Sequence, residues 1–365
     1  LGANKEIAID AAGPVVFSVG STYNGAYKAA ENIPVGIGFN EPVVVTGTPR
    51  LLLVVGAASR YIDYTSGSGT DILTFTYTVA AGDISTDLDY QDVNSLELNG
   101  GSINDMMGNP ATLILPYPGV AGSLSGNNDI IIDAIDPIIT GVDRSKSDGI
   151  YGTGWHIPVT ITFNETVCVG GNPRLLLNAG SGTYANYESG SGTAILTFNY
   201  TATAGENSAD LDYAAASALE LNGGTVKDVA GNNASLDLPA PAAAGSLGSN
   251  RNIIIDTTAP AISAIMINEN TMVADSYISL LPAIRGTFSD SNAVGAWEIS
   301  VADQNKQPVA GLAYAGVGNP ASWNPDLAAL IEEQEYYFRV NAQDTFGNIM
   351  AATYSAPFKL RNTDL

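Results

Sequence analysis

Short stretches of alternating apolar and polar residues recur along the whole chain. IPVTITF at residues 157–163 and AILTFNY at residues 194–200 place every second side chain on one face, which is typical of half-buried β-strands. Runs such as SGSG, NGG and AGN separate these stretches, and their glycines permit the positive φ values of tight turns. The pattern predicts an all-β chain with one helical patch, PDLAALIEE at residues 325–333.

Two of these strand sets are copies of one another. The run from PRLLL through SGSGT, DLDY and LELNGG to IIID occupies residues 49–133 and recurs at residues 173–256. After residue 256, TTAPAI opens a divergent unit that keeps strand-like stretches but lacks SGSG and LELNGG. Because short strands at this spacing form sandwiches, we expect three tandem Ig-like Greek-key β-sandwich domains in an extended array. Their expected bounds are residues 1–133, 134–256 and 257–365, and the last resembles a fibronectin-type module.

The first ten residues also match the end of a repeat. LGANKEIAID at residues 1–10 corresponds to LGSNRNIIID at residues 247–256. We therefore expect residues 1–10 to be the tail of a preceding repeat, and the chain to be cut from a longer array.

Composition and charge exclude several classes of function. The chain has 37 Asp and Glu against 14 Lys and Arg, so no cationic surface is expected for nucleic acid or for an anionic membrane. No apolar run is long enough for membrane insertion. One histidine, His156, and one cysteine, Cys168, argue against a zinc site or a histidine-dependent enzyme. Cys168 aligns with Val44, so we expect a small buried hydrophobic side chain.

Acidic residues recur at the places where one unit ends and the next begins. A DxxGN motif occurs in each unit, at residues 105–109, 228–232 and 344–348, and FNE or FSD occurs earlier in each. We assign DxxGN to the FG loop, and FNE, or FSD in the third unit, to the BC loop. In an Ig-like sandwich these two loops lie at the same end as the N-terminus. We expect the connecting Asp to meet both loops in three sets: Asp10, Glu41, Asp105 and Asn109; Asp133, Asp136, Glu165, Asp228 and Asn232; Asp256, Asp290, Asp344 and Asn348.

Converging carboxylates repel one another unless a cation neutralises them. Ligand sets made only of oxygen atoms favour Ca²⁺ over zinc or copper, so the expected cofactor is Ca²⁺. The alternative is that DxxGN is a β-turn in which Asp accepts backbone amides without a metal. The DLDY motif leaves a similar choice between a second calcium site and a tyrosine-corner role for Tyr90 and Tyr213.

The linked run SGSGT, DLDY, LELNGG, DxxGN and IIIDTTAP resembles the tandem bacterial Ig-like extender repeats of large RTX-type cell-surface adhesins. The resemblance covers the first two units nearly end to end, and the third more weakly. It implies export to the bacterial cell surface, a stalk function, and calcium that stiffens the junctions between domains.

The sequence therefore predicts a structural extender segment of a secreted bacterial adhesin, a monomer without enzymatic activity whose partners are neighbouring repeats of the same chain. No GxSxG with a histidine partner, HExxH or P-loop motif is present. The alternative function is recognition of a glycan or host protein by the C-terminal domain. That hypothesis rests on four aromatic residues, Trp297, Trp323, Tyr336 and Tyr337.

Overall fold

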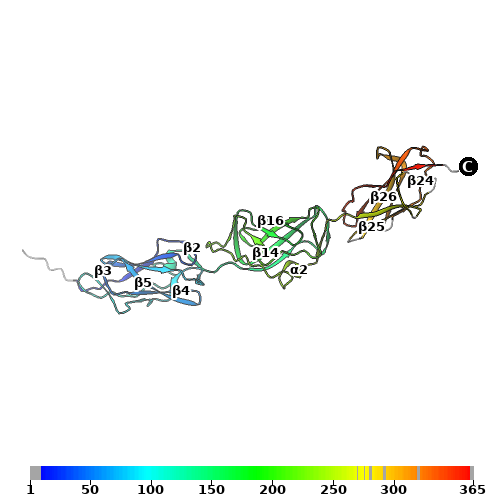
Figure 1. Ribbon diagram of the computed structural model, residues 1–365. Coiled ribbons are helices and arrows are strands. Elements are labelled where there is room, and N and C mark those ends of the chain that lie inside the picture. Colours follow the sequence, from blue (N-terminus) through cyan, green and yellow to red (C-terminus); the bar gives the residue numbers. More distant parts are fainter. Residues whose placement is uncertain are drawn as a thin grey trace, which may run out of the picture.

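Three β-sandwich domains follow one another in a row (Figure 1). The computed structural model describes residues 10–268, 270–274, 276–278, 282–290, 293–318 and 321–361. Residues 1–9, on which the expected tail of a preceding repeat depends, lie outside the described residues. The predicted all-β fold of tandem sandwiches is confirmed, and each domain has its own hydrophobic core. No helix among the described residues is long and apolar enough to cross a membrane.

The first two domains have the same strand order. In the first, the order is β1-β3-β6-β5-β4-β8, with a small separate sheet β2-β11-β7. Its elements are β1 (Val16–Gly20), β2 (Gly25–Tyr27), β3 (Asn32–Thr46), β4 (Arg50–Val55), β5 (Ala58–Ser66), β6 (Thr70–Thr78), β7 (Ile84–Ser85), β8 (Asp89–Tyr90), β9 (Leu96–Glu97), β10 (Ser102–Asn104), α1 (Leu124–Asn127) and β11 (Ile130–Asp133).

The second domain repeats this arrangement as β12-β14-β17-β16-β15-β19, with a small sheet β13-β21-β18. Its elements are β12 (Ile139–Arg144), β13 (Gly149–Tyr151), β14 (His156–Gly170), β15 (Arg174–Leu176), β16 (Tyr184–Ser189), β17 (Thr193–Thr201), β18 (Asn207–Ser208), β19 (Leu219–Glu220), β20 (Thr225–Lys227), α2 (Leu247–Asn250) and β21 (Ile253–Asp256).

The third domain has two sheets, β23-β22-β25-β28 and β24-β31-β29-β26-β27, an order typical of fibronectin-like sandwiches. Its strands are β22 (Ala261–Ile267), β23 (Asn270–Thr271), β24 (Ser276–Ile278), β25 (Ile284–Ser289), β26 (Val294–Asp303), β27 (Pro308–Val317), β28 (Ala321–Trp323), β29 (Glu335–Asp344), β30 (Thr353–Tyr354) and β31 (Phe358–Leu360).

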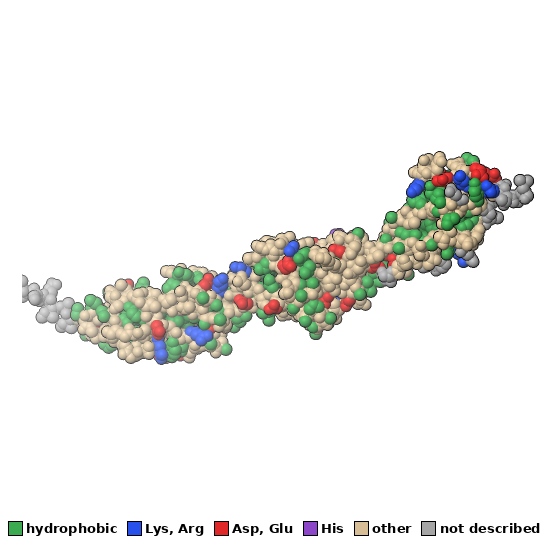
Figure 2. All heavy atoms as spheres, in the orientation of Figure 1, with side chains coloured by type: hydrophobic (Ala, Val, Ile, Leu, Met, Phe, Trp, Pro, Cys, Tyr) green, Lys and Arg blue, Asp and Glu red, His purple; other side chains and the backbone are tan. Residues whose placement is uncertain are grey.

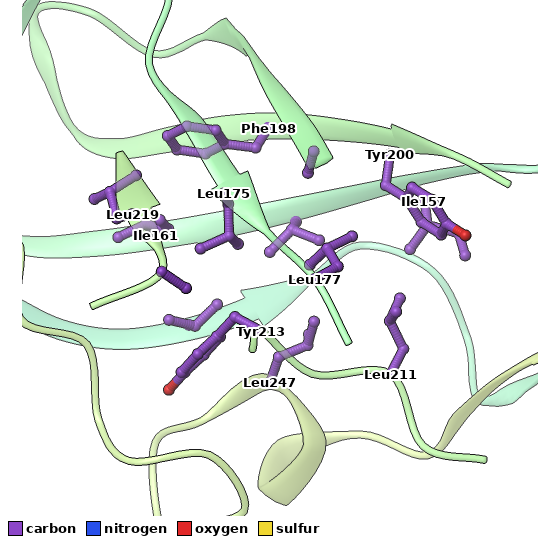
Figure 3. Packing of buried hydrophobic residues seen from close by; sticks show 14 of the residues in the cluster. Ile157, Ile161, Leu175, Leu177, Phe198, Tyr200, Leu211, Tyr213, Leu219 and Leu247 are labelled. Atoms are coloured by element: carbon purple, nitrogen blue, oxygen red, sulfur yellow. The ribbon is translucent and has the colours of Figure 1, made fainter. Parts of the chain in front are cut away.

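Alternating residues of these strands fill the cores. Figure 3 shows Ile157, Leu175 and Phe198 of the second domain facing one another between the layers, with Tyr213 and Leu247 below them. All five are at most 1% exposed. The Tyr213 hydroxyl donates to the carbonyl oxygen of Pro239 at 2.5 Å, so the buried ring keeps a partner for its polar end.

Two expectations about local structure are wrong. Residues 325–333 form turns and irregular backbone instead of a helix, because this short segment connects β28 to β29. Cys168 is exposed, since it follows the buried Val167 on β14 and therefore points to the opposite face of the strand.

Charged side chains are sparse on the face of the molecule that Figure 2 shows. The face shown in Figure 2 is mostly polar and apolar, with Asp, Glu, Lys and Arg scattered singly or in small groups. Three groups of acidic residues differ from these scattered charges. Each group lies at the start of a domain.

Candidate metal centres

Three carboxylates converge at the start of each domain. The described residues contain three such groups: Asp10, Glu41 and Asp105; Asp133, Glu165 and Asp228; Asp256, Asp290 and Asp344. In each group one oxygen from every residue lies within 4.8 Å of the others. Two oxygens that bind the same Ca²⁺ at about 2.4 Å are at most about 4.8 Å apart, so each group is compact enough for one ion.

The connecting Asp of each later group is fixed by the preceding domain. Asp133 is the last residue of β11, which pairs with β2 and β7, and Asp256 ends the equivalent β21 between β13 and β18. The strand pairing holds the backbone of the connecting Asp in one domain, while its side chain reaches the carboxylates of the next. A cation bound there would contact two domains at once.

The Glu of the FNE motif is positioned by a long strand and not by a loop. In the first domain β3 pairs with β6 as far as Gly38, and the register then shifts before Val43. Glu41 lies in this irregular segment, after which β3 pairs with β10. Glu165 occupies the same place in β14. Only Asp290 lies in a connection, between β25 and β26, as expected for a BC loop.

The DxxGN motif forms a turn around its own Asp. Asp344 Oδ1 accepts the backbone N–H groups of Phe346 and Asn348 at 2.8 and 2.9 Å. Gly347 has a φ of 92°, a conformation that favours glycine. Burial raises the pKa of the equivalent Asp105, but hydrogen bonds from Asn109 and backbone amides outweigh this effect and lower it. The turn alternative is therefore realised, and the same carboxylates still lie in the acidic groups.

The Asn of DxxGN ties the two domains together through its amide. Asn348 Nδ2 donates to the carbonyl oxygen of Asp256 at 2.8 Å and to Asp344 Oδ2 at 2.6 Å. Asn232 makes the same pair of bonds to Asp133 and Asp228, at 2.7 and 2.6 Å. An amide N–H cannot bind a cation. The Nδ2 groups of Asn232, Asn348 and Asn109 therefore orient the carboxylates, and the expectation that these Asn residues also act as ligands stays a prediction for their Oδ1 atoms.

The acidic groups carry unfavourable electrostatic energy. Two carboxylate charges whose oxygens lie 4.8 Å apart repel by about 3 kcal/mol at an effective dielectric constant of about 20. Burial and the neighbouring Asp133 and Asp228 raise the pKa of Glu165. A divalent cation would remove this repulsion. The side chains of each group offer carboxylate oxygens, which are ligands for hard divalent cations.

Some predicted acidic residues lie outside the groups. Asp136 is exposed and is absent from the compact set formed by Asp133, Glu165 and Asp228. In the DLDY motif, Asp89 Oδ2 accepts from Ser125 Oγ at 2.6 Å and from the Gly119 N–H at 3.0 Å, which fastens the loop before α1.

The hydroxyl of Tyr90 donates to Pro116, 26 residues downstream, at 2.6 Å. The DLDY pair therefore holds a loop, although the bond runs forward along the chain and not back as in a tyrosine corner.

The aromatic residues considered for ligand recognition do not form a common exposed surface. Trp297 and Tyr336 are 6% and 4% exposed and belong to the core of the third domain. Trp323 packs edge-on against Phe338 at a centroid distance of 6.5 Å, and it is half-buried.

Sequence reasoning missed a second contact at each junction. Lys28 Nζ donates to the carbonyl oxygen of Gly231, within the DVAGN turn of the next domain, at 3.2 Å. The equivalent residue of the second domain is Gly152, which is buried. A Cβ at Gly152 would lie 3.0 Å from the carbonyl oxygen of Phe346. The residue after β2 or β13 thus touches the DxxGN turn of the next domain. The sequence did not predict this contact, because the two equivalent positions carry unlike residues, Lys28 and Gly152.

Comparison with known proteins gives only distant similarities. No family model and no curated protein matches the chain. A bacterial ice-binding adhesin structure is 13% identical, with coverage of 95% of this chain and 98% of that one at a TM-score of 0.39. A tetra-tandem repeat from the extending region of a large adhesion protein is 14% identical, with 96% and 74% coverage and a TM-score of 0.27.

The FN1–FN3 domains of chicken CNTN1 are 9% identical, with 96% and 100% coverage and a TM-score of 0.25. With TM-scores of 0.39 or less in these three comparisons, the chain is not placed in a family.

Proposed function

We propose that this chain is a structural extender segment of a secreted bacterial surface adhesin, in which Ca²⁺ stiffens the domain junctions. The observation that carries the proposal is the recurrence of one carboxylate from a connector and two from the following domain. The sequence resemblance to adhesin extender repeats supports the bacterial surface location. The protein acts as a monomeric spacer without enzymatic activity, and its length serves to hold another domain away from the cell.

Calcium acts in this proposal as a bridge between domains. Carboxylates fixed to adjacent bodies bind one ion, so bending at the junction would break ligand contacts. The Asn amide and the paired strand keep the oxygens in place before the ion binds, which lowers the ordering cost. Because the ion binds only the folded protein, a concentration of about 100 times Kd stabilises the junction by about 2.7 kcal/mol.

The test compares Asp228→Asn with Asp136→Asn in the full chain. Both changes remove one negative charge near the same junction, but only Asp228 belongs to the compact group. We expect Asp228→Asn to weaken calcium binding at this junction by about tenfold or more, equivalent to about 1.4 kcal/mol. Calorimetric titration should then lose one site from the stoichiometry. Asp136→Asn should keep the stoichiometry and change the affinity much less, because Asp136 acts on Glu165 only through its charge.

Small-angle scattering gives the mechanical readout. With calcium the wild-type chain should be longer and less variable in shape than in excess chelator, and its melting temperature should be higher. Equal scattering curves and equal melting in both conditions would contradict a bridging metal. Because Trp297 and Tyr336 are buried, no observation favours the alternative of a recognition platform on the third domain.

A further inference from the structure

The first domain has a surface groove on the outer face of β1, β3 and β6. The groove has a volume of about 390 Å³, within the range of about 300–1,000 Å³ that is typical of small-molecule sites. Its floor is the backbone of Gly36, which faces outward between the buried Val35 and Ile37. Two apolar side chains line it although they are largely exposed: Phe17 is 60% exposed and Ile72 is 53% exposed.

Polar groups around the groove complete its chemistry. Asp71 is exposed beside Ile72 and has no hydrogen-bond partner among the described residues. Ser18 and Thr74 add hydroxyl groups to the lining. The site thus offers an aromatic ring, a flat backbone floor and a carboxylate that only accepts hydrogen bonds.

The second domain provides an internal comparison, because residues with side chains replace the glycines on the same face there. Strand pairing makes Thr160 the counterpart of Gly36, since Thr160 pairs with Thr197 as Gly36 pairs with Thr74. Thr162 likewise replaces Gly38. Thr140 stands where the first domain has Phe17. The sister domain therefore lacks both the bare floor and the aromatic wall.

An ion pair also closes one end of this face in the second domain. Arg251 Nε and Nη2 donate to Asp143 at 2.8 and 3.2 Å. The counterparts in the first domain are Gly20 and Asn128, which both line the groove. Two copies of one fold thus differ at the floor, the wall and the end of the same surface. In the first domain the floor and the end are open, and the wall gains an aromatic ring.

We propose that this groove binds a neutral saccharide. A sugar ring has an apolar face that packs on an aromatic ring and hydroxyl donors that match a carboxylate acceptor. Asp71 and the net charge of −23 disfavour anionic ligands. The site adds a recognition function to the first domain that does not depend on calcium or on the spacer role.

The experiment uses saturation-transfer NMR on the intact chain with methyl glucoside, methyl galactoside and methyl mannoside as probes, and N-acetylneuraminic acid as the anionic probe. A neutral glycoside should give transfer signals and the acid should give none. Asp71→Asn and Phe17→Ala should each weaken binding by about tenfold or more. Gly36→Thr installs the residue of the second domain and should abolish binding, because its side chain would occupy the floor of the groove. The added Cβ would lie 3.3 Å from Ile72 Cγ2 and 3.6 Å from the Gly20 carbonyl oxygen, so only a small shift of Ile72 is needed.

Ile195→Ala is the matched control, since Ile195 is the exposed counterpart of Ile72 in the second domain. It should leave binding unchanged, and all variants should keep the wild-type melting temperature. The proposal is overturned if no neutral glycoside binds at millimolar concentration, or if binding survives Gly36→Thr. It is also overturned if Phe17→Ala abolishes self-association of the chain instead, because the occupant would then be a second copy.

Discussion

At the scale of single residues, buried Asp83 is the clearest source of stability outside the junctions. Its carboxylate is 1% exposed and accepts from Tyr77 at 2.7 Å and from Arg60 at 2.8 Å. Burial raises the pKa of Asp83, but these bonds and the Ala80 amide outweigh it and lower the pKa. A carboxylate with a lowered folded-state pKa stabilises the protein above its unfolded pKa, and the contribution disappears as pH falls through the folded value.

We therefore expect Asp83→Asn to destabilise the first domain by about 1–3 kcal/mol at neutral pH. The difference from wild type should shrink as pH falls below about 4, the ordinary Asp value in the unfolded chain, and disappear once folded Asp83, whose pKa is lower, also takes up a proton. Hydrogen exchange of β5 and β6 amides in the intact chain measures the effect. Asp63→Asn, an exposed change on β5, is the control and should alter little. A difference that persists unchanged at low pH would show that the charge of Asp83 is not responsible.

At the scale of elements, the alternating pattern predicted where strands lie but not the irregular segments that interrupt them. Residues 157–163 form part of β14, as predicted, and residues 33–39 form the corresponding part of β3. The sequence did not reveal that each strand continues to Thr46 or Gly170 through an irregular segment. The alternating pattern reflects which side chains are buried, and it is interrupted in the irregular segment. Buried side chains resume beyond that segment, at Val43 and Val167. The helix predicted for PDLAALIEE is absent, because tertiary context can override local helix propensity.

The SGSG turn between β5 and β6 offers a test at this scale. Gly67 and Gly69 both have positive φ, 110° and 89°. A Cβ at Gly67 would lie 2.1 Å from the carbonyl oxygen of Ile72, whereas a Cβ at Gly69 would meet nothing within 4 Å. Gly69→Ala should cost about 1–2 kcal/mol from backbone strain alone. Gly67→Ala should cost at least about 1 kcal/mol more, because the hairpin backbone must move.

Thermal unfolding of the two variants in the intact chain measures this difference. Equal losses of stability would mean that the turn relaxes freely and that the close contact has no energetic weight. The same pair exists as Gly190 and Gly192 in the second domain, with the same 2.1 Å approach to a backbone carbonyl oxygen at Gly190 only. The ranking should therefore be the same there.

At the scale of the whole molecule, the sequence predicted which carboxylates meet because three independent repeats carried them at equivalent places. Topology then placed the connector beside the following domain. Asp136 was included because a sequence gives no side-chain direction, and it lies outside the group. The sequence did not reveal that the Asn amides also bond to the connector, because spacing gives no side-chain direction.

The two junctions should also differ in stiffness, since Lys28 crosses only the first. Lys28→Met removes the bond to Gly231 and leaves the carboxylates of that junction unchanged. A spin label on exposed Cys168 and another on Gln91→Cys would report the distance between the first two domains. With calcium present, Lys28→Met should broaden this distance distribution, and chelation should broaden it further. Lys146→Met should have no effect, because Lys146 packs over Trp155 within its own domain. An unchanged distribution in Lys28→Met would leave the cation and the Asn amide as the sole restraints on bending.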